Sequence, residues 1–262
     1  MTSVGKRFPF DAVRKGVLEG SVIKTFLTAF TYRLHALLGT WKNVDAFLPL
    51  TAYAGQLLLR GRLSIPKEHI DVKPNFIEPL APVSGQREPY FLFIGRLSEE
   101  KGIRQLLQVF NRPDAPPLRI IGDGPLRNLL NTSFNPDLRY LGHLNREEVG
   151  HYLARCKGVV VPSVCLEGGF TLVLMEGLAL KTPVILSRLM AASEIIKDGE
   201  NGFLIDPRDF SEKLQTINQY PDLDQIGEAG FKTYELHFTK EKVMHRLEEI
   251  YQKVLRQSAA PG

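Results

Sequence analysis

Two glutamates, Glu167 and Glu176, interrupt an otherwise apolar stretch over residues 161–187. A turn at Gly168 and Gly169 lies between them, and a helix starting directly after this turn points unpaired backbone N–H groups into it. Such a helix start is a site for an anion, phosphate above all. A carboxylate in an apolar helix is costly unless it is hydrogen-bonded, and either a sugar diol or a backbone amide would satisfy Glu176. Glu167 could accept hydrogen bonds from sugar hydroxyls, and an acid/base pair remains the alternative.

Arg96 and Lys101 form a second chemical group, at the end of one predicted strand and the start of the next predicted helix. Gly95 allows the chain to turn sharply directly before them. A guanidinium grips two oxygens at once and an ammonium adds a compact charge, so the pair suits a diphosphate. The alternative is that Arg96 forms a surface ion pair with Glu99 or Glu100.

Two further loops carry weaker signals. Gly124 lies in a GDGP turn that completes neither a dinucleotide-binding glycine pattern nor a P-loop, so a simple glycine turn before a helix competes with a binding role. Leu144 follows Gly142 and His143, where a backbone edge could lie beside a nucleotide base. The carboxylates are not spaced as a set of metal ligands, so we expect no metal ion.

These loops need a scaffold that brings them together, and the pattern from residue 90 onward supplies one. Short apolar runs alternate with segments of helical spacing, which predicts an α/β fold with a doubly wound parallel sheet. The predicted strands are residues 90–96, 118–124, 138–144, 158–163, 183–188 and 201–207. The predicted helices are residues 102–112, 125–134, 146–156 (capped by Asn145), 171–180, 192–199 and 239–258. Ligands of such sheets bind at the carboxyl ends of the strands, where all the loops above are expected.

The first 80 residues are less regular. They are predicted to hold a helix over 21–38, a short strand over 45–51, a helix over 51–61 with Thr51 as its N-cap, and an extended segment over 69–79. A linker containing proline and glycine follows at 81–89.

Positive charge is concentrated in this front part. Residues 1–73 carry 11 Lys and Arg against 5 Asp and Glu, a net charge of +6. This favours an anionic partner or a membrane surface, although a solvated helix face would carry the same charges. The apolar run at 22–41 contains Lys24, Arg33 and His35, so we expect an amphipathic helix packed on protein rather than a membrane span.

Five segments, in their order and spacing, resemble the donor-binding half of retaining glycosyltransferases of family 4, which have the GT-B fold. The segments are GRLSEEKG, IGDGP, VVVPS, EGGFTLVLMEG and DGENGFLIDP, within residues 70–245. The resemblance implies that Arg96 and Lys101 bind the donor diphosphate and that Glu176 binds the ribose. It also implies that Glu167 and the turn hold the sugar and phosphate. The donor-binding set implied in this way is completed by Gly95, Gly124, Leu144, Gly168, Gly169, Phe170 and Thr171.

Two departures from the family pattern matter. Eight residues separate Glu167 from Glu176 where the family has seven, so alignment on the helix puts Gly168 in the place of the first glutamate. Either the turn bulges and Glu167 still reaches the sugar, or that contact is lost. The family's front domain is also largely missing, so the chain looks truncated at its N-terminus. The expected parts are an acceptor-domain remnant, the donor-binding domain and a C-terminal helix packed back on the front segment, over residues 1–80, 81–238 and 239–262.

The expected function is transfer of a sugar from a nucleotide-diphosphate donor to an acceptor hydroxyl, with retention. The expected partners are a UDP- or GDP-type nucleotide sugar and an acceptor sugar or lipid-linked glycan, with no nucleic acid and no cofactor. Cys156 and Cys165 are expected to be free thiols, and no secretory signal is evident, which indicates a cytoplasmic protein with membrane contact left open.

The alternatives are a donor-binding remnant without turnover and, less favoured, a nucleotide-sugar epimerase of the same fold. If residues 1–80 do not complete a domain, the helix over 21–38 should expose apolar surface and promote self-association.

Overall fold

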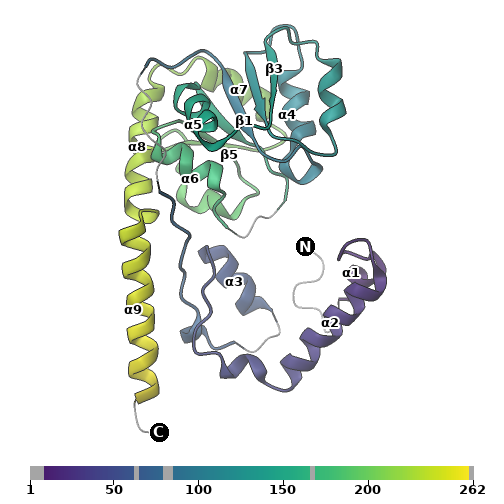
Figure 1. The fold of residues 1–262 in the computed structure, drawn as a ribbon, viewed down its shortest axis with the longest axis vertical. Helices are drawn as coiled ribbons and strands as arrows, with labels where there is room; N and C mark the ends of the chain where they lie inside the picture. The colour runs from purple at the N-terminus through teal and green to yellow at the C-terminus, as the bar shows by residue number, and fades with distance from the viewer. Residues whose placement is uncertain (1–8, 62–64, 79–84, 166–168, 260–262) are drawn as a thin grey trace. The chain divides into compact units, whose positions relative to one another are not determined.

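The computed structural model describes residues 9–61, 65–78, 85–165 and 169–259 (Figure 1). The chain divides into two compact units. The larger unit is Pro74–Val243, and the smaller combines Met1–Lys73 with Met244–Gly262. The boundary after Val243 falls inside the last helix, α9 (Lys240–Ala259), so this helix contributes residues to both units.

A six-stranded parallel sheet forms the centre of the larger unit, with the strand order β3-β2-β1-β4-β5-β6 (Figure 1). The strands are β1 (Phe91–Ile94), β2 (Leu118–Ile121), β3 (Leu138–Gly142), β4 (Gly158–Val161), β5 (Val184–Ser187) and β6 (Phe203–Ile205). β1 pairs with β2 on one side and with β4 on the other. All six strands lie within the ranges expected from the sequence, and the expected doubly wound α/β fold is confirmed.

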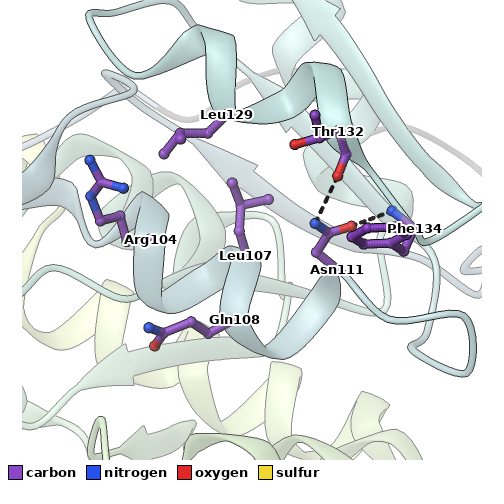
Figure 2. Close-up of a pocket in the computed structure, with 7 residues that line it drawn as sticks. All are labelled: Arg104, Leu107, Gln108, Asn111, Leu129, Thr132 and Phe134. Atoms are coloured by element: carbon purple, nitrogen blue, oxygen red, sulfur yellow. Dashed lines mark hydrogen bonds between the residues drawn. The ribbon is translucent and has the colours of Figure 1, made fainter.

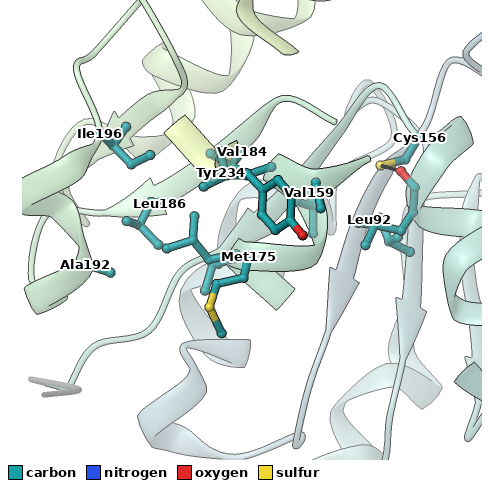
Figure 3. Packing of buried hydrophobic residues seen from close by; sticks show 14 of the residues in the cluster. Leu92, Cys156, Val159, Met175, Val184, Leu186, Ala192, Ile196 and Tyr234 are labelled. Carbon is teal, nitrogen blue, oxygen red and sulfur yellow. Dashed lines mark hydrogen bonds between the residues drawn. The ribbon is translucent and has the colours of Figure 1, made fainter. Parts of the chain in front are cut away.

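Helices cover both faces of the sheet because successive side chains of each strand point to opposite faces. Leu92 belongs to the core shown in Figure 3, which also contains residues of α5 (Arg146–Arg155), α6 (Leu172–Ala179) and α8 (Leu223–His237). Its neighbours Phe91 and Phe93 belong to a second core, with residues of α4 (Ile103–Phe110) and α7 (Phe210–Asn218). The helices that follow β1 and β4, which are α4 and α6, therefore cover opposite faces.

Two predicted helix starts are confirmed in detail. The Thr51 hydroxyl accepts a hydrogen bond from the Ala54 amide at 3.1 Å and caps α3 (Ala52–Arg60). Asn145 caps α5 in a reciprocal capping box with Glu148, at 2.9 Å in both directions. Both caps satisfy backbone amides that the first helical turn leaves unpaired.

Two predicted α-helices are instead short 3-10 helices, η4 (Arg127–Thr132) and η5 (Ala191–Ile195). The C-terminal end of η4 is bonded to the residue that follows α4, because the Asn111 side-chain amide donates to the Thr132 carbonyl at 3.1 Å. In η5, the Asn201 side chain bonds both the Ile195 carbonyl and the Lys197 amide and so ends the segment early. These are tertiary contacts that helical spacing does not reveal.

The smaller unit contains α1 (Phe10–Arg14), α2 (Val22–Leu37) and α3. The strand expected over 45–51 is reduced to one isolated parallel bridge between Phe47 and Ile70. Pro49 has no N–H to donate, so one bond of a regular ladder is missing here, although its carbonyl accepts a hydrogen bond from the Lys73 amide at 2.9 Å. The buried carboxylate of Asp71 pairs with two side chains of α9, Arg246 at 3.0 Å and Lys253 at 2.8 Å.

Helix α2 does not pack on protein through its apolar side, contrary to expectation. Within α2, all of which is described, Thr25 is the only buried residue, whereas its large apolar side chains are exposed. Helix α2 therefore exposes a large apolar surface. No helix in the described part of the chain combines the length and the apolar character needed to cross a membrane.

Candidate functional site

The direction of the chain crossovers reverses between β1 and β4. These strands are neighbours, but the chain leaves β1 for a helix on one face and β4 for a helix on the other. In open α/β sheets, such a reversal leaves a crevice beyond the carboxyl ends of the two strands, where ligands bind. The loop after β1 carries Arg96 and Lys101, and the loop after β4 leads to the start of α6. The fold thus brings the two strongest sequence signals to one place.

Backbone contacts tie the loops after β1 and β4 together. The Val164 amide donates to the Glu100 carbonyl at 3.1 Å. Gly102 has a positive φ of 75°, and a Cβ at this position would lie only 2.0 Å from the Pro162 carbonyl oxygen. Only glycine fits both the left-handed backbone and the close approach. Backbone contacts on either side of Lys101 therefore hold it close to the β4 loop.

The loop after β2 is joined to the loop after β1 in the same way. The Leu97 amide donates to the Asp123 carbonyl at 2.9 Å, and the Leu126 amide donates to the Leu97 carbonyl at 2.9 Å. A Cβ on Gly124 would lie 2.5 Å from the Leu97 carbonyl oxygen. The glycine turn at Gly124 thus has a packing reason of its own, beside any contact with a ligand.

Arg96 is exposed, and among the described residues it forms no ion pair. Glu99, one of the two ion-pair partners considered for Arg96, pairs with Arg104 instead, at 2.6 Å. The pKa of Glu100 is lowered, first by the Ser98 hydroxyl and also by the positive charges of Arg96 and Lys101. The guanidinium of Arg96 and the ammonium of Lys101 thus both act on the same loop.

The start of α6 is built from residues of the glycine turn. The Thr171 hydroxyl accepts a hydrogen bond from the Leu174 amide at 3.3 Å, and the Thr171 carbonyl accepts the Met175 amide at 3.2 Å. The Phe170 ring packs edge-on against Phe238, with ring centroids 4.9 Å apart. Thr171 and Phe170 thus fix where α6 begins, and Gly169 directly precedes them. Glu167 and Gly168 lie outside the described residues.

Glu176 lies half-buried in α6, and burial raises its pKa above the ordinary value of 4.5. The positive charge of Arg146, at the start of α5, acts in the opposite direction. Leu144 is partly buried against the core that includes α6. Sequence reasoning missed Arg146, although a basic residue directly after the cap of a helix that follows a strand end is a recognisable signal.

A separate groove of about 380 Å³ lies between α4 and η4 (Figure 2). Its lining residues are Arg104, Leu107, Gln108, Asn111, Leu129, Thr132 and Phe134. It contains none of the residues singled out from the sequence. We therefore place the site at the ends of β1 and β4 and not in this groove. Among the described residues, no three His, Cys, Asp or Glu side chains are grouped to hold a metal ion.

Solved structures show the same fold. HepE from Anabaena, crystallised in complex with UDP, superposes with a TM-score of 0.70 at 18% identity, over 80% of this chain and 64% of its own. The six-stranded parallel sheet flanked by helices found here matches the GT-B fold of glycosyltransferases. At this identity the likeness concerns the fold alone.

Curated relatives are similar over about two thirds of the chain. An uncharacterized glycosyltransferase of Methanocaldococcus jannaschii is 32% identical over 171 residues, which are 62% of this chain and 48% of the relative. O-antigen chain mannosyltransferase C of Escherichia coli is 27% identical over 181 residues, 63% of this chain and 47% of the relative. The chain thus spans about half the length of these relatives. The profile of the family described as "Glycosyl transferases group 1" matches residues 88–220, more than half of the chain. The chain therefore belongs to the group 1 glycosyl transferases.

Proposed function

We propose that the chain binds a nucleotide-diphosphate sugar between the ends of β1 and β4 and transfers the sugar to an acceptor hydroxyl with retention. The observation that carries this proposal is the backbone junction between the β1 and β4 loops, which holds Arg96 and Lys101 beside the segment that leads to α6. Further support comes from the names of similar proteins, which include HepE in complex with UDP and a GDP-mannose-dependent mannosyltransferase of Corynebacterium glutamicum.

In this proposal, Arg96 and Lys101 stabilise the departing diphosphate. Negative charge grows on the leaving group as the bond to the sugar breaks, so fixed cations act more strongly on the transition state than on the bound donor. A well-placed electrostatic donor of this kind contributes on the order of 3–4 kcal/mol. The start of α6, from Gly169 to Thr171, adds backbone amides near the phosphates. Cations and a helix start take the place of a metal ion.

The remaining predicted residues have positioning roles in the proposal. Glu176 accepts hydrogen bonds from the ribose hydroxyls, which relieves the cost of its burial. Gly95, Gly124 and Leu144 offer backbone edges to the nucleotide. Glu167 and Gly168, outside the described residues, stay proposed contacts to the sugar.

Different parts of the chain have different roles in the proposal. Residues 81–238 form the donor side, and residues 1–80 with the C-terminal helix over 239–262 belong to the acceptor side. The acceptor is a sugar or a lipid-linked glycan, and the donor base is uracil or guanine. The proposed site of action is the cytoplasm, because free thiols are typical of that reducing compartment.

Isothermal titration of the full chain with UDP, GDP and the matching monophosphates tests the donor site. We expect the diphosphate of one base to bind with or without EDTA and to bind better than its monophosphate. Arg96→Ala should weaken it about tenfold or more, which corresponds to a loss of about 1.4 kcal/mol. Arg104→Ala is the matched control, since Arg104 is an exposed arginine of the adjoining helix. Equal binding of mono- and diphosphate, or an unaffected Arg96→Ala variant, would exclude this site.

Donor binding without turnover is the second candidate, because the family match covers residues 88–220, on the proposed donor side only. Incubation of the chain with labelled UDP- and GDP-sugars separates the two functions. Release or transfer of labelled sugar supports an enzyme, whereas tight binding with the donor left intact supports the alternative.

A further inference from the structure

Helix α2 packs against its own unit with its small and polar side. Thr25 is buried there, and its hydroxyl accepts a hydrogen bond from the Leu18 amide at 3.0 Å and donates one to the Ser21 carbonyl at 2.7 Å. Ala29 and Ala36 lie on the same side and are half-buried. An ordinary surface helix of a folded protein buries its apolar stripe and exposes its polar residues. In α2 this arrangement is reversed.

The outer face of α2 is defined by the large apolar residues Ile23, Leu27, Phe30, Leu34 and Leu37, all of them exposed. The exposed fraction reaches 72% at Ile23 and 69% at Leu37. Val22, Phe26 and Leu38, also exposed, widen this face to a sector of about 160° at 100° per residue. A helix that pairs with one other helix needs only a narrow seam, so this sector is too broad for a simple coiled-coil contact.

Charge indicates what covers this face. Residues 1–43 carry seven Lys and Arg against two Asp and Glu. Arg14, Lys15, Lys24 and Lys42 are exposed on α1, α2 and the segments beside them, and Lys24 pairs with the exposed Glu19. Two copies of this chain would bring like charges together, whereas an anionic lipid surface attracts each cation near it. A broad apolar face next to clustered cations is the pattern of a helix that lies in a membrane interface.

We infer that the outer face of α2 docks onto an anionic lipid bilayer, with the helix lying in the plane of the interface. The 16 residues of α2 span about 24 Å at 1.5 Å per residue, which is shorter than a bilayer core of about 30 Å. The apolar side chains enter the boundary between headgroups and acyl chains, and the cations contact the headgroup phosphates. This inference does not depend on nucleotide binding, so it can fail while the donor site stands.

Vesicle sedimentation of the full chain tests this inference, with Trp41 fluorescence as a second readout. Trp41 is the single tryptophan of the chain and stacks on Tyr32 of α2 at 5.8 Å, so it reports on the helix. The probes are vesicles of equal parts phosphatidylcholine and phosphatidylglycerol, and vesicles of phosphatidylcholine alone. We expect binding to the mixed vesicles, weakened by salt, with a blue shift of Trp41 emission, and much weaker binding to phosphatidylcholine.

The double variant Leu27→Gln/Phe30→Gln should lose affinity for the mixed vesicles on the order of 100-fold, because two large side chains leave the apolar phase. Both side chains are exposed, so the fold should survive, which circular dichroism checks. Phe134→Gln is the matched control, an aromatic residue of the other unit that is 72% exposed against 51% for Phe30, and it should bind as the parent does. No binding to mixed vesicles, or equal loss in the control, would overturn the inference. So would light scattering that shows a dimer abolished by the double variant, which would make a second copy the occupant.

Discussion

Glu176 combines a binding role with a cost in stability. It is the one carboxylate on α6, and its surroundings are apolar enough to raise its pKa. Among the described residues Glu176 forms no ion pair, and the charge of Arg146 is what favours its ionised form. A residue that destabilises the empty fold and has a proposed hydrogen-bonding role in the liganded one is the usual compromise of a binding site.

Glu176→Gln should therefore stabilise the ligand-free protein at neutral pH and weaken nucleotide-diphosphate binding. A carboxyl with a raised pKa holds its proton more tightly in the folded chain than in the unfolded chain. The contribution of Glu176 to stability is therefore greatest below pH 4.5 and falls as the pH rises from 4.5 through the folded pKa. The glutamine variant lacks this fall, so its Tm advantage, on the order of 1–3 °C, should appear above that range and vanish below it.

Thermal melts of both proteins across this pH range measure the effect, and titration with UDP or GDP measures the binding loss. Glu99→Gln serves as the control, since Glu99 is exposed and paired with Arg104. A Tm difference that does not change with pH would show that burial of Glu176 is not its source.

At the scale of elements, the site depends on how closely the loops approach one another. Strands β1, β2 and β4 end at the same edge of the sheet, and backbone hydrogen bonds then join their loops. Glycines at the contact points allow backbone to meet backbone. The loops are thus positioned as a group, and a change at one contact should alter the affinity for nucleotide.

Gly102→Ala should destabilise the chain and also weaken nucleotide binding. Its new Cβ meets the Pro162 carbonyl at 2.0 Å and must push the β1 loop away from the β4 loop. Gly199→Ala is the matched control, because Gly199 has a similar φ of 78° but nothing within 4 Å of its Cβ position. Backbone strain costs both variants about 1 kcal/mol, and the clash adds roughly 1–3 kcal/mol to the first.

Denaturant unfolding and isothermal titration separate these effects. Gly199→Ala should lose stability but keep its affinity for nucleotide. Gly102→Ala should lose stability and also bind nucleotide severalfold more weakly. If both variants bind nucleotide like the parent, the junction of the loops does not position the ligand.

At the scale of the whole molecule, the chain is a large α/β unit joined to a smaller unit with little apolar core. The two hydrophobic clusters lie almost wholly between Ile77 and Phe238, in the larger unit. The smaller unit relies more on polar contacts, and Asp71 is central to them because two cations of α9 bind its buried carboxylate.

Asp71→Asn should selectively destabilise the smaller unit, by about 1–3 kcal/mol, since two charge-assisted hydrogen bonds are lost. The cost stays moderate because Arg246 and Lys253 are partly exposed and can turn to water. Trp41 lies in this unit, so its fluorescence during urea unfolding follows it directly. Glu249→Gln removes an exposed partner of Arg246 and should cost no more than about 0.5 kcal/mol. Equal effects of the two changes would contradict a special role for Asp71.

Much of the larger unit could be predicted from the sequence because its signals are local. An apolar run such as Phe91–Ile94 has the length and character of a strand buried on both faces, and the cap at Asn145 depends on a residue three positions away. The candidate residues Arg96, Lys101 and Glu176 were recognisable because a charge beside apolar strand or helix residues is costly without a purpose.

Contacts between distant residues were decided only by the tertiary structure. The strand order, the junction of Gly102 with Pro162 and the field of Arg146 at Glu176 all join positions far apart in the chain. The same holds for α2, whose periodic pattern predicted a helix but not which side would face the protein. The sequence by itself determined the α/β class, the six strands of the larger unit and the candidate residues of the proposed site. Tertiary packing decided which loops meet and which helix face stays exposed, because those outcomes depend on partners that no local pattern encodes.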